Sequence, residues 1–596
     1  MADIDCDVAV VGAGIAGGIV ARHLAAAGVR VIVLEAGEAT GQTWDDYQSN
    51  VRMYMTAGAK VPNSAYPSSP AAPSPTVLDK SNLVPGGPPG TTGYFVQCGP
   101  QPFGSDYQRS KGGTMLHWYG HAIRMLPNDF RMKSVYGQGE DWPIGYGDLV
   151  PYYEMAEREI GVAAEVEERR IHGSEFPEGY VFPMFKVPLS YADSVFAAAV
   201  NGKTVTYGDG DYEIGVTSLP QGRNTMPNPD YDGGRGYTPV GAVGRAQAGL
   251  RCEGNSSCIP ICPVQAKYNA LKTLDAATRN GAQIITQAVA SQLELTDGLV
   301  SGIRYQRWSG QSRPIADWRA LRARIYVLAA NAIENVTLTL GSGLQSKYLG
   351  HCLMDHPFLP AWGLAPQSVG AFRGPGTTSG IESLRDGPFR SRLGAFRADI
   401  SNWGWDLTGA PITDVEQAVR QDRLCGTSLR RQLADTVPRQ IQLGFLVEQL
   451  PDIDNRVTID PGYRDVLGNY RPVIHYDIGS YTRAGLAAAR QVSRQVFALL
   501  GAQDATVYDQ SDVGYLEWEG ESYWVLGAGH IMGTHRMGAT ASDSVVDSYQ
   551  RCWEHRNLFL VGCGSMRTTG TSNPTLTLAA LAFRTVEQIL ADLRSP

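Results

Sequence analysis

Apolar residues in the first 35 positions fall into three runs with different spacing. Residues 8–11 form a continuous apolar run, residues 29–34 form a second run in which only Arg30 is polar, and residues 19–27 between them repeat apolar positions at helical intervals. Short continuous runs are typical of strands buried on both faces of a sheet, whereas apolar positions three and four apart are typical of helices. The pattern therefore predicts a strand, a helix and a second, parallel strand.

Later segments repeat this pattern at long intervals. The run at 326–329 leads into a helix-like segment, and NLFLVGCGSM at 557–566 precedes an apolar helix that begins near Pro574. Proline is harmless there because the first turn of a helix needs no N–H donor. Strand-like alternation at 282–330 and a long helix at 483–500 lie between these runs. We therefore expect an α/β fold (α+β overall) whose nucleotide-binding domain is discontinuous.

Composition and charge exclude several classes of protein. The chain has 596 residues, 43% of them hydrophobic and 18% charged, which is typical of a globular protein with several domains. A formal net charge of −8 argues against a nucleic-acid partner, which would need clustered basic residues. We see no run of about 18 apolar residues that would cross a membrane, and we expect no export signal in MADIDCDVAVVGAG. Nine cysteines, an odd number, disfavour a disulfide scaffold.

A glycine motif follows the first predicted strand. Gly12, Gly14 and Gly17 have G-x-G-x-x-G spacing, and the second strand ends at Glu35. Gly12 permits a tight turn, Gly14 lets the backbone approach a pyrophosphate, and Gly17 lets the helix pack on the strand. Glu35 is placed to accept hydrogen bonds from a ribose diol. An unrelated glycine-rich turn is the alternative, but every part of a dinucleotide-binding unit occurs here in order. Its place at the start of the chain favours FAD over NAD.

The segment KGGTMLHW at 111–118 is a second candidate for the cofactor site. Gly112 and Gly113 permit close backbone approach, and His117 would then lie near an isoalloxazine ring. The alternative is a buried histidine in a turn. The preceding segment, 62–92, is rich in proline, serine and glycine, which predicts a long loop that is either a lid or a solvated excursion.

Residues at the ends of the downstream strands complete the predicted site. Asn331 and Gly564 follow two of these strands, at the sheet edge where ligands bind in such folds. Asn573 lies between the last strand and the last helix, and His530 lies in a glycine-bounded loop. Oxidation of an alcohol by a flavin needs a base for the hydroxyl proton, which suits His530, and a polar group for the oxygen, which suits Asn573. His535 is the rival base.

Three of the nine cysteines are concentrated in RCEGNSSCIPICP. Cys252, Cys258 and Cys262 have the spacing C-x5-C-x3-C. Thiolates bind iron–sulfur clusters, and a zinc site or structural thiols are the alternatives. Zinc normally takes four ligands, and no nearby histidine completes the set. The chain has no C-x-x-C-H motif, so any haem would belong to another chain.

Several of these motifs together resemble one enzyme family. The chain resembles the glucose–methanol–choline (GMC) oxidoreductases nearly from end to end, and within them the catalytic subunits of bacterial fructose dehydrogenase and FAD-dependent glucose dehydrogenase. The resemblance rests on VGAGIAG, GGTMLHW, LPNDFRMKSVYGQGEDWPI, CEGNSSCIPICPVQAKYN, VLAANAIE, LGHCLMDHP, HIMGTHRMG, DSVVD and GTSNPTLT. It implies a glutathione-reductase-like FAD domain interleaved with a substrate domain built on an antiparallel sheet.

The resemblance also implies roles for single residues. His530 falls on the catalytic base, Asn573 on its partner, and His117 where some relatives link FAD covalently. The cysteine segment falls where those dehydrogenases hold a [3Fe–4S] cluster, which relays electrons to a cytochrome c subunit. Some relatives begin this segment with a Cys-Cys doublet, whereas here the second position is Glu253.

The segments of the expected domains follow from these assignments. Those of the FAD domain are 1–135 (with the loop 62–92), 246–345 (with the cysteine segment 252–262) and 526–596 (with the catalytic pair). Those of the substrate domain are 136–245 and 346–525.

We expect an FAD-dependent dehydrogenase that oxidises a hydroxyl of a sugar or polyol and passes electrons through the cluster to a redox partner. The alternatives are a stand-alone sugar oxidase that uses O₂ and has structural cysteines, and a non-catalytic flavoprotein subunit. A small subunit and a cytochrome c subunit are the expected partners. Without a signal of its own, the chain would reach the periplasm or the membrane surface through a partner, or stay in the cytoplasm if it acts alone.

Overall fold

The computed structural model describes most of the chain. The described residues are 4–39, 43–56, 66, 68–75, 91, 93–208, 210–240, 251, 252, 254, 261–309, 317–371, 375–403 and 412–594. Most of the predicted loop 62–92 and Cys258 therefore lie outside the described residues.

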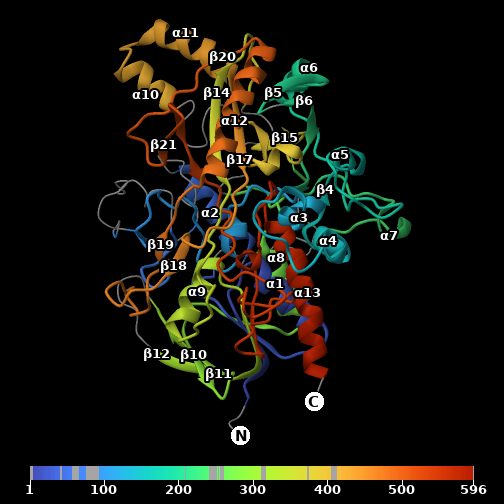
Figure 1. Ribbon diagram of the computed structural model, residues 1–596, viewed down its shortest axis with the longest axis vertical. Helices are drawn as coiled ribbons and strands as arrows, with labels where there is room; N and C mark the ends of the chain where they lie inside the picture. Colours follow the sequence, from blue (N-terminus) through green and yellow to red (C-terminus); the bar gives the residue numbers. More distant parts are fainter. Residues whose placement is uncertain are drawn as a thin grey trace.

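A five-stranded parallel sheet forms the centre of the lower half of the molecule (Figure 1). Its strand order is β24-β13-β1-β2-β9, with bounds β24 (Leu558–Leu560), β13 (Ala323–Leu328), β1 (Cys6–Val11), β2 (Val31–Leu34) and β9 (Gln283–Ile285). Val10 of β1 pairs with Val33 on one side and Val327 on the other. The strands come from sequence positions up to several hundred residues apart, and the apolar runs of β1, β13 and β24 are mostly buried between covered faces.

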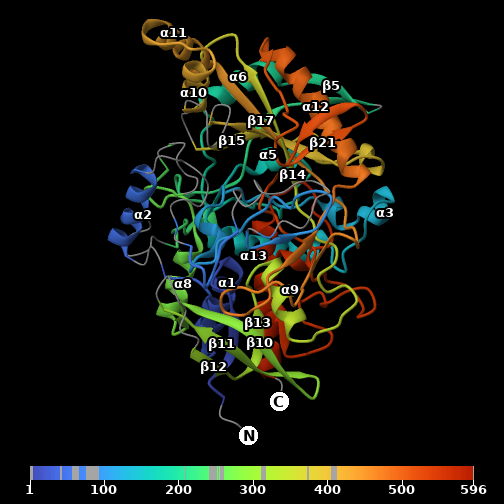
Figure 2. The same cartoon turned by 90° about the vertical axis from the view of Figure 1, so that its left-hand side faces the viewer.

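Helices and a second small sheet surround these strands. The helices α1 (Ile15–Ala26), α8 (Ala270–Arg279), α13 (Thr575–Arg594) and α4 (Tyr146–Ile160) pack in sequence, α8 on α1, α1 on α13, and α13 on α4. The three-stranded antiparallel sheet β10-β11-β12 contacts β2 and the helix α9 (Ala332–Gly341), with bounds β10 (Ala288–Thr296), β11 (Leu299–Arg307) and β12 (Asp317–Leu321). Both chain ends lie at this lower end of the molecule (Figures 1 and 2).

The upper half is built on a seven-stranded antiparallel sheet. Its order is β20-β14-β17-β16-β15-β7, with β23 also paired to β14. The bounds are β20 (Gln503–Asp504), β14 (Pro357–Leu364), β17 (Gln440–Val447), β16 (Phe396–Ser401), β15 (Thr377–Ile381), β7 (Val216–Ser218) and β23 (Leu526–Gly527). The long helix α12 (Ser480–Leu500) packs on β14 and β17. The α/β class with an antiparallel-sheet second unit is thereby confirmed.

The remaining elements are smaller sheets and further helices. Strand pairs and a small mixed sheet are formed by β5 (Lys203–Tyr207) with β6 (Gly210–Ile214), β21 (Tyr515–Trp518) with β22 (Glu521–Trp524), β4 (Val162–Ala163) with β8 (Gln221–Gly222), and β18 (Arg456–Thr458) with β19 (Val473–His475) and β3 (Val96–Gln97). The other helices are α2 (Trp44–Thr56), α3 (Met132–Tyr136), α5 (Val166–Ile171), α6 (Tyr191–Val200), α7 (Tyr231–Gly234), α10 (Ile412–Arg420) and α11 (Gly426–Thr436). In the described part of the chain, no helix combines the length and the apolar character that crossing a membrane requires.

The first helix begins earlier than the apolar spacing predicts. Periodicity indicated residues 19–27, whereas α1 starts at Ile15. Gly14 is its N-cap, and Gly17 and Gly18 occupy its first turn. Glycine contributes no side chain to the periodic pattern, so apolar spacing cannot detect the part of the helix that approaches a ligand.

Candidate active site

A cavity of about 540 Å³ lies between the parallel sheet and the antiparallel sheet. One wall is formed by the carboxyl ends of the parallel strands, including Val11, Leu34 and Ala329. Another wall is formed by residues of β14, β16 and β17, which belong to the antiparallel sheet. Ligands usually bind at the carboxyl edge of a parallel sheet, so the cavity lies where the sequence predicted the site.

The glycine motif forms an open cradle at one end of the cavity. Gly12 has φ +101°, and a Cβ there would lie 2.5 Å from the carbonyl oxygen of Ala329. A Cβ on Gly17 would lie 2.0 Å from the carbonyl oxygen of Gly12, so Gly17 permits the packing of helix on strand and does not line the cavity. Gly14 lines the cavity, and a Cβ there would meet no protein atom within 4 Å. The first N–H groups of α1 therefore lie beside free space, as pyrophosphate binding requires.

Glu35 lies at the end of β2 on the same wall. Its carboxylate accepts hydrogen bonds from the backbone N–H groups of Ala13, at 2.8 Å, and Gly37, at 2.9 Å. Burial raises its pKa, and these backbone donors oppose the increase. Glu35 thus joins the glycine turn to the strand end and presents acceptor oxygens to the cavity.

The GGTMLHW segment closes the cavity next to this cradle. Gly112, at φ +105°, donates its N–H to the carbonyl of Ala13 at 2.9 Å. Gly113, at φ +57°, lies against Gly14 and lines the cavity. His117 also lines the cavity, and its Nδ1 is buried without a hydrogen-bond partner among the described residues. Burial lowers the pKa of His117 to about 4, so the ring is neutral at physiological pH.

The two predicted residues on the downstream strands have different positions. Asn331 lines the cavity at φ +89° and caps α9 by accepting the Ile333 N–H at 3.0 Å. Gly564 is absent from the described cavity wall, and a Cβ there would lie 2.2 Å from Nε2 of His535. Gly562 and Cys563 line the wall in its place. The chain turns between Gly562 and Gly564, and an apolar strand pattern in the sequence does not show which residue such a turn places at the cavity.

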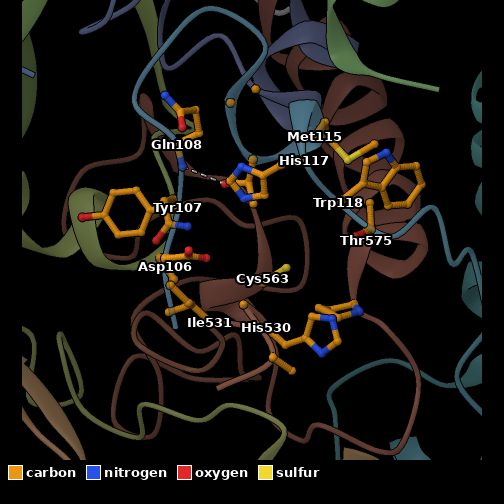
Figure 3. Close-up of a pocket in the computed structure, with 18 of the residues that line it drawn as sticks. Asp106, Tyr107, Gln108, Met115, His117, Trp118, His530, Ile531, Cys563 and Thr575 are labelled. Carbon is orange, nitrogen blue, oxygen red and sulfur yellow. Dashed lines mark hydrogen bonds between the residues drawn. The ribbon is translucent and has the colours of Figure 1, made fainter. Parts of the chain in front are cut away.

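His530 and Asn573 meet at the wall of the cavity. The side-chain nitrogen Nδ2 of Asn573 lies 3.0 Å from Nε2 of His530, although 43 residues separate them along the chain. Figure 3 shows His530 and His117 as separate side chains around the same space, with Cys563 between them in that view. The structure therefore brings the predicted pair together beside the predicted cofactor segment.

A second histidine determines which nitrogen of His530 carries the proton. Nε2 of His356 lies 2.9 Å from the carbonyl oxygen of Gly570, so this nitrogen must be the donor. Nδ1 of His356 lies 2.9 Å from Nδ1 of His530, and His530 must then donate in that contact. Nε2 of His530 is consequently unprotonated and accepts from Asn573.

The electrostatic surroundings keep this pair of histidines neutral. The pKa of His530 is held well below its ordinary range by burial first, and then by His356, Arg397 and His121. Burial also lowers the pKa of His356 to about 3. His530 is therefore a free base with its lone pair at Nε2, which is the state needed to take a proton from a hydroxyl.

Arg397 of β16 holds Asn573 in position. Its guanidinium donates to the side-chain oxygen Oδ1 of Asn573 at 2.6 Å and to the carbonyl of Thr571 at 2.8 Å, and its Nε donates to Asp399 at 2.8 Å. Because Arg397 occupies Oδ1, the amide Nδ2 must face His530. Arg385 binds the same loop through Thr571, at 3.0 Å, and Ser572, at 2.6 Å.

The loop of His530 is fixed from the other side by Asp355. The carboxylate oxygen Oδ1 of Asp355 accepts the backbone N–H groups of His356, at 2.7 Å, and His530, at 3.1 Å. Its other oxygen accepts from Ser105, which in turn accepts the Gly529 N–H at 2.7 Å. Sequence reasoning did not assign His356, Asp355 or Arg397. The segment LGHCLMDHP contained two of them, but its spacing carries no sign of the contact with His530.

His535, the rival base, lies outside the described cavity wall. Its Nε2 is 3.3 Å from Nδ2 of Asn335, and the ring packs against Gly564. A base must reach the proton that it removes. The geometry therefore favours His530 for that role.

The cysteine segment adjoins the cavity wall. Sγ of Cys262 accepts the Lys267 N–H at 3.5 Å, and Nζ of Lys267 donates to the carbonyl of Trp118, which lines the cavity. Cys252 donates its N–H to the carbonyl of Asn224 at 2.8 Å. Within the residues that the structure describes, no group of three or more His, Cys, Asp or Glu side chains is arranged to hold a metal. Cys258 lies outside that part.

The residues present fit FAD. The cradle at Gly14 has room for a pyrophosphate, Glu35 lies where the ribose of a dinucleotide would be expected, and Nδ1 of His117 is a buried polar atom that a ligand could satisfy. The cavity continues from there to His530 and Asn573, so bound FAD and a substrate hydroxyl would share one space.

Comparisons with known proteins agree with this geometry. Residues 238–358 and 451–582 match models of the GMC oxidoreductase family, and residues 7–47 match a model of FAD dependent oxidoreductases. The chain is 30% identical to the fructose dehydrogenase large subunit of Gluconobacter japonicus over 99% of both chains. It is 24% identical to the 2-methyl-1,2-propanediol dehydrogenase of Mycolicibacterium austroafricanum over 80% of both. The crystal structure of a formate oxidase has the same fold, with a TM-score of 0.61, 13% identity and 98% coverage of both chains.

The family segments contain much of the site described above. His356 lies in the first matched GMC segment, and His530 and Asn573 lie in the second. A full-length relative at 30% identity adds independent support. The chain therefore belongs to the GMC oxidoreductase family, as a flavoprotein enzyme that uses FAD and acts on alcohol- or sugar-type substrates.

Proposed function

We propose that the protein is a dehydrogenase that oxidises a hydroxyl group of a sugar or polyol and passes the electrons through an iron–sulfur cluster to a redox partner. The observation that carries the catalytic part is the unprotonated Nε2 of His530, which faces the cavity and is set by the hydrogen bonds to His356 and Asn573. The relative named fructose dehydrogenase large subunit supports a sugar substrate.

Each residue of the pair has a separate task. His530 accepts the hydroxyl proton at Nε2 while its Nδ1–H stays bound to His356. The Asn573 amide, oriented by Arg397, has a second N–H that can donate to the substrate oxygen. Bound FAD supplies a hydride acceptor for the carbon that carries this oxygen. The positive charge of Arg397 disfavours a protonated His530, so the accepted proton is readily released for the next turnover.

The cysteine segment supports an electron outlet. Cys252, Cys258 and Cys262 would hold a [3Fe–4S] cluster, which carries single electrons. The Lys267 N–H that bonds to Cys262 Sγ is the type of contact that tunes cluster sulfur, and Lys267 also contacts the cavity wall at Trp118. A small subunit and a cytochrome c subunit are the proposed partners. We further propose that the protein acts at the periplasmic or membrane surface through such a partner, or in the cytoplasm if it acts alone.

Anaerobic mixing of the FAD-loaded protein with a panel of sugars and polyols tests the catalytic part. Bleaching of the oxidised flavin absorbance by at least one sugar or polyol is the expected result. Failure of every member of the panel, in a preparation that dithionite does reduce, would contradict the proposal. It would favour a non-catalytic flavoprotein.

Iron and acid-labile sulfide content, with low-temperature electron paramagnetic resonance, tests the electron outlet. About three irons per flavin and the signal of an oxidised cluster are expected from protein purified quickly under argon. A flavin-loaded protein without iron that produces peroxide without an added acceptor would instead be a sugar oxidase, with structural cysteines.

A further inference from the structure

The cavity has a second polar site next to Arg397, the arginine that orients Asn573. His121, which forms a β-bridge with Gln221, is only 1% exposed and lines the cavity. Asp399 of β16 lines the same part of the wall. Nδ1 of His121 lies 3.6 Å from the carboxylate oxygen Oδ2 of Asp399, which is longer than a hydrogen bond.

His121 has unused hydrogen-bonding capacity. Both ring nitrogens are buried without a hydrogen-bond partner in the described part of the protein. Burial lowers the pKa of His121 to about 4, so the neutral ring presents one donor and one acceptor. A buried polar group that makes no hydrogen bond lowers the stability of the folded protein. Such a group therefore needs an explanation, and beside a cavity a bound ligand is one.

Asp399 is only partly satisfied by its neighbour. Arg397 donates to Oδ1 at 2.8 Å and to Oδ2 at 3.2 Å, on one side of the carboxylate. Lone pairs of this carboxylate remain for a donor in the cavity. The same guanidinium bonds to Oδ1 of Asn573 at 2.6 Å, so the His121–Asp399 site is joined to the catalytic pair through one rigid side chain.

Aromatic side chains border this site. Tyr119 and Trp403 pack edge to face with ring centroids 4.9 Å apart, and both line the cavity. The ring of Tyr119 lies 5.8 Å from that of His121. A small number of polar groups between aromatic side chains is typical of sites that bind a small ligand with polar substituents on a carbon framework.

We infer that His121 and Asp399 bind a second hydroxyl of the substrate, on the carbon next to the one that is oxidised. A hydroxyl group donates one hydrogen bond and accepts others, which matches a carboxylate acceptor beside a neutral imidazole donor. The inference rests on the proposed function and deepens it, because it makes the substrate class a vicinal diol and not a simple alcohol. A simple alcohol would leave the ring nitrogens of His121 and the remaining lone pairs of Asp399 without a partner, and such sites discriminate strongly against the analogue that lacks the hydroxyl.

The test compares two alcohols that differ by one hydroxyl. The FAD-loaded protein is mixed anaerobically with cyclohexanol and with trans-1,2-cyclohexanediol, and the rate of flavin reduction is measured against concentration. The wild-type protein should reduce its flavin with the diol at least about tenfold more efficiently. His121→Phe should remove most of this preference by lowering the efficiency with the diol, and His121→Asn, which can donate and accept, should restore part of it. His475→Phe is the matched control, because His475 does not line the described cavity wall.

Each failure has its own signature. Equal efficiency of the two alcohols with wild-type protein would overturn the second-hydroxyl site, as would equal losses with both alcohols in His121→Phe. The wild-type comparison decides the matter even if His121→Phe does not fold. Flavin that neither these alcohols nor any sugar reduces would instead remove the proposed function, and this inference with it.

Discussion

His530 owes its expected reactivity to hydrogen bonds that extend past the cavity wall. The Gly570 carbonyl orients His356, His356 orients His530, and Arg397 orients Asn573 against the same imidazole. Each of these contacts allows only one atom to be the donor, so Nε2 of His530 is already unprotonated before a substrate binds. At the scale of the residue, these contacts support the proposed role of His530 as the base.

The pH dependence of flavin reduction should reflect this arrangement. Because burial, His356 and Arg397 hold the pKa of His530 well below 6.5, the base stays neutral in mild acid, and the acid limb of kcat/KM should lie below pH 6.5. His530→Asn should lower the reduction rate by about 10² to 10⁴-fold. Stopped-flow reduction across the pH range in which the protein keeps its flavin would measure both effects. An acid limb at or above pH 6.5 would contradict the assignment.

Arg397 should act as a positioning residue. In Arg397→Lys the single ammonium cannot hold Asp399, Thr571 and Asn573 together, so kcat should fall by about tenfold to a hundredfold while FAD content is retained. The exposed ion pair of Arg494 with Glu521 offers the control, and Arg494→Lys should change neither kcat nor KM by more than about twofold. A variant with normal kcat would show that Asn573 needs no such support.

Helix α1 shows how one element serves both packing and binding. Gly17 faces the turn at Gly12, and Gly14 faces the cavity. Their chemical identity is the same, but the surroundings of their missing side chains differ. At the scale of the element, only the space around each position separates a packing glycine from a binding glycine.

Alanine at these two positions should therefore give different defects. Gly14→Ala meets no protein atom within 4 Å, so the apoprotein should fold normally but bind FAD at least about tenfold more weakly. Gly17→Ala places a Cβ 2.0 Å from the Gly12 carbonyl, so it should lower the free energy of unfolding by about 2 kcal/mol or more. Urea unfolding of the apoproteins and flavin titration separate the two. Equal stability losses in both variants would refute the distinction.

The loop that carries Asn573 depends on elements from both halves of the molecule. Gly570, at φ +55°, packs on the carboxylate of Asp129, which comes from the LPNDF segment. Arg390 binds that carboxylate at 2.7 Å. The LPNDF segment, in the sequence only a sign of family resemblance, therefore packs against the loop that carries Asn573.

Acid should destabilise the whole molecule through its buried histidines. Burial lowers the pKa of five of them to about 4 or below, namely His117, His121, His172, His356 and His535. It also holds the pKa of His530 well below the ordinary histidine value. The unfolded chain then binds more protons than the folded chain as the pH falls from about 6.5 towards 4, so stability is present above this window and is lost within it. Each histidine that titrates fully removes about 1.4 kcal/mol per pH unit.

Urea midpoints of the FAD-loaded protein between pH 7 and pH 5 would measure this loss. His172 does not line the described cavity wall, so His172→Gln should reduce the slope by up to about one proton without changing the site. Glu35 and Asp129, whose pKa burial raises, bind protons more readily in the folded chain and therefore act in the opposite direction. Stability independent of pH in this window would mean that the histidines are protonated in the folded protein.

Local patterns were sufficient for the parallel unit and its cofactor turn. The first strand, the glycines and Glu35 lie within one short segment, and steric and hydrogen-bonding rules act over that range. The α/β fold class, the GMC family and the enzyme class were predicted correctly on such motifs. The domain boundaries and the roles of the site residues stay predictions, and Gly564 lies away from the described cavity wall, against His535.

The sequence alone determined which chemical groups the protein has and where its regular elements begin to form. Only the tertiary structure decided which of those groups meet. His356 comes directly before β14 and Arg397 lies in β16, both more than a hundred residues before Asn573. Only the closure of the antiparallel sheet over the parallel one brings them to His530 and Asn573. The same closure leaves His121 buried and unpartnered among the described residues. Protonation state and substrate recognition depend on such contacts, which no local spacing encodes.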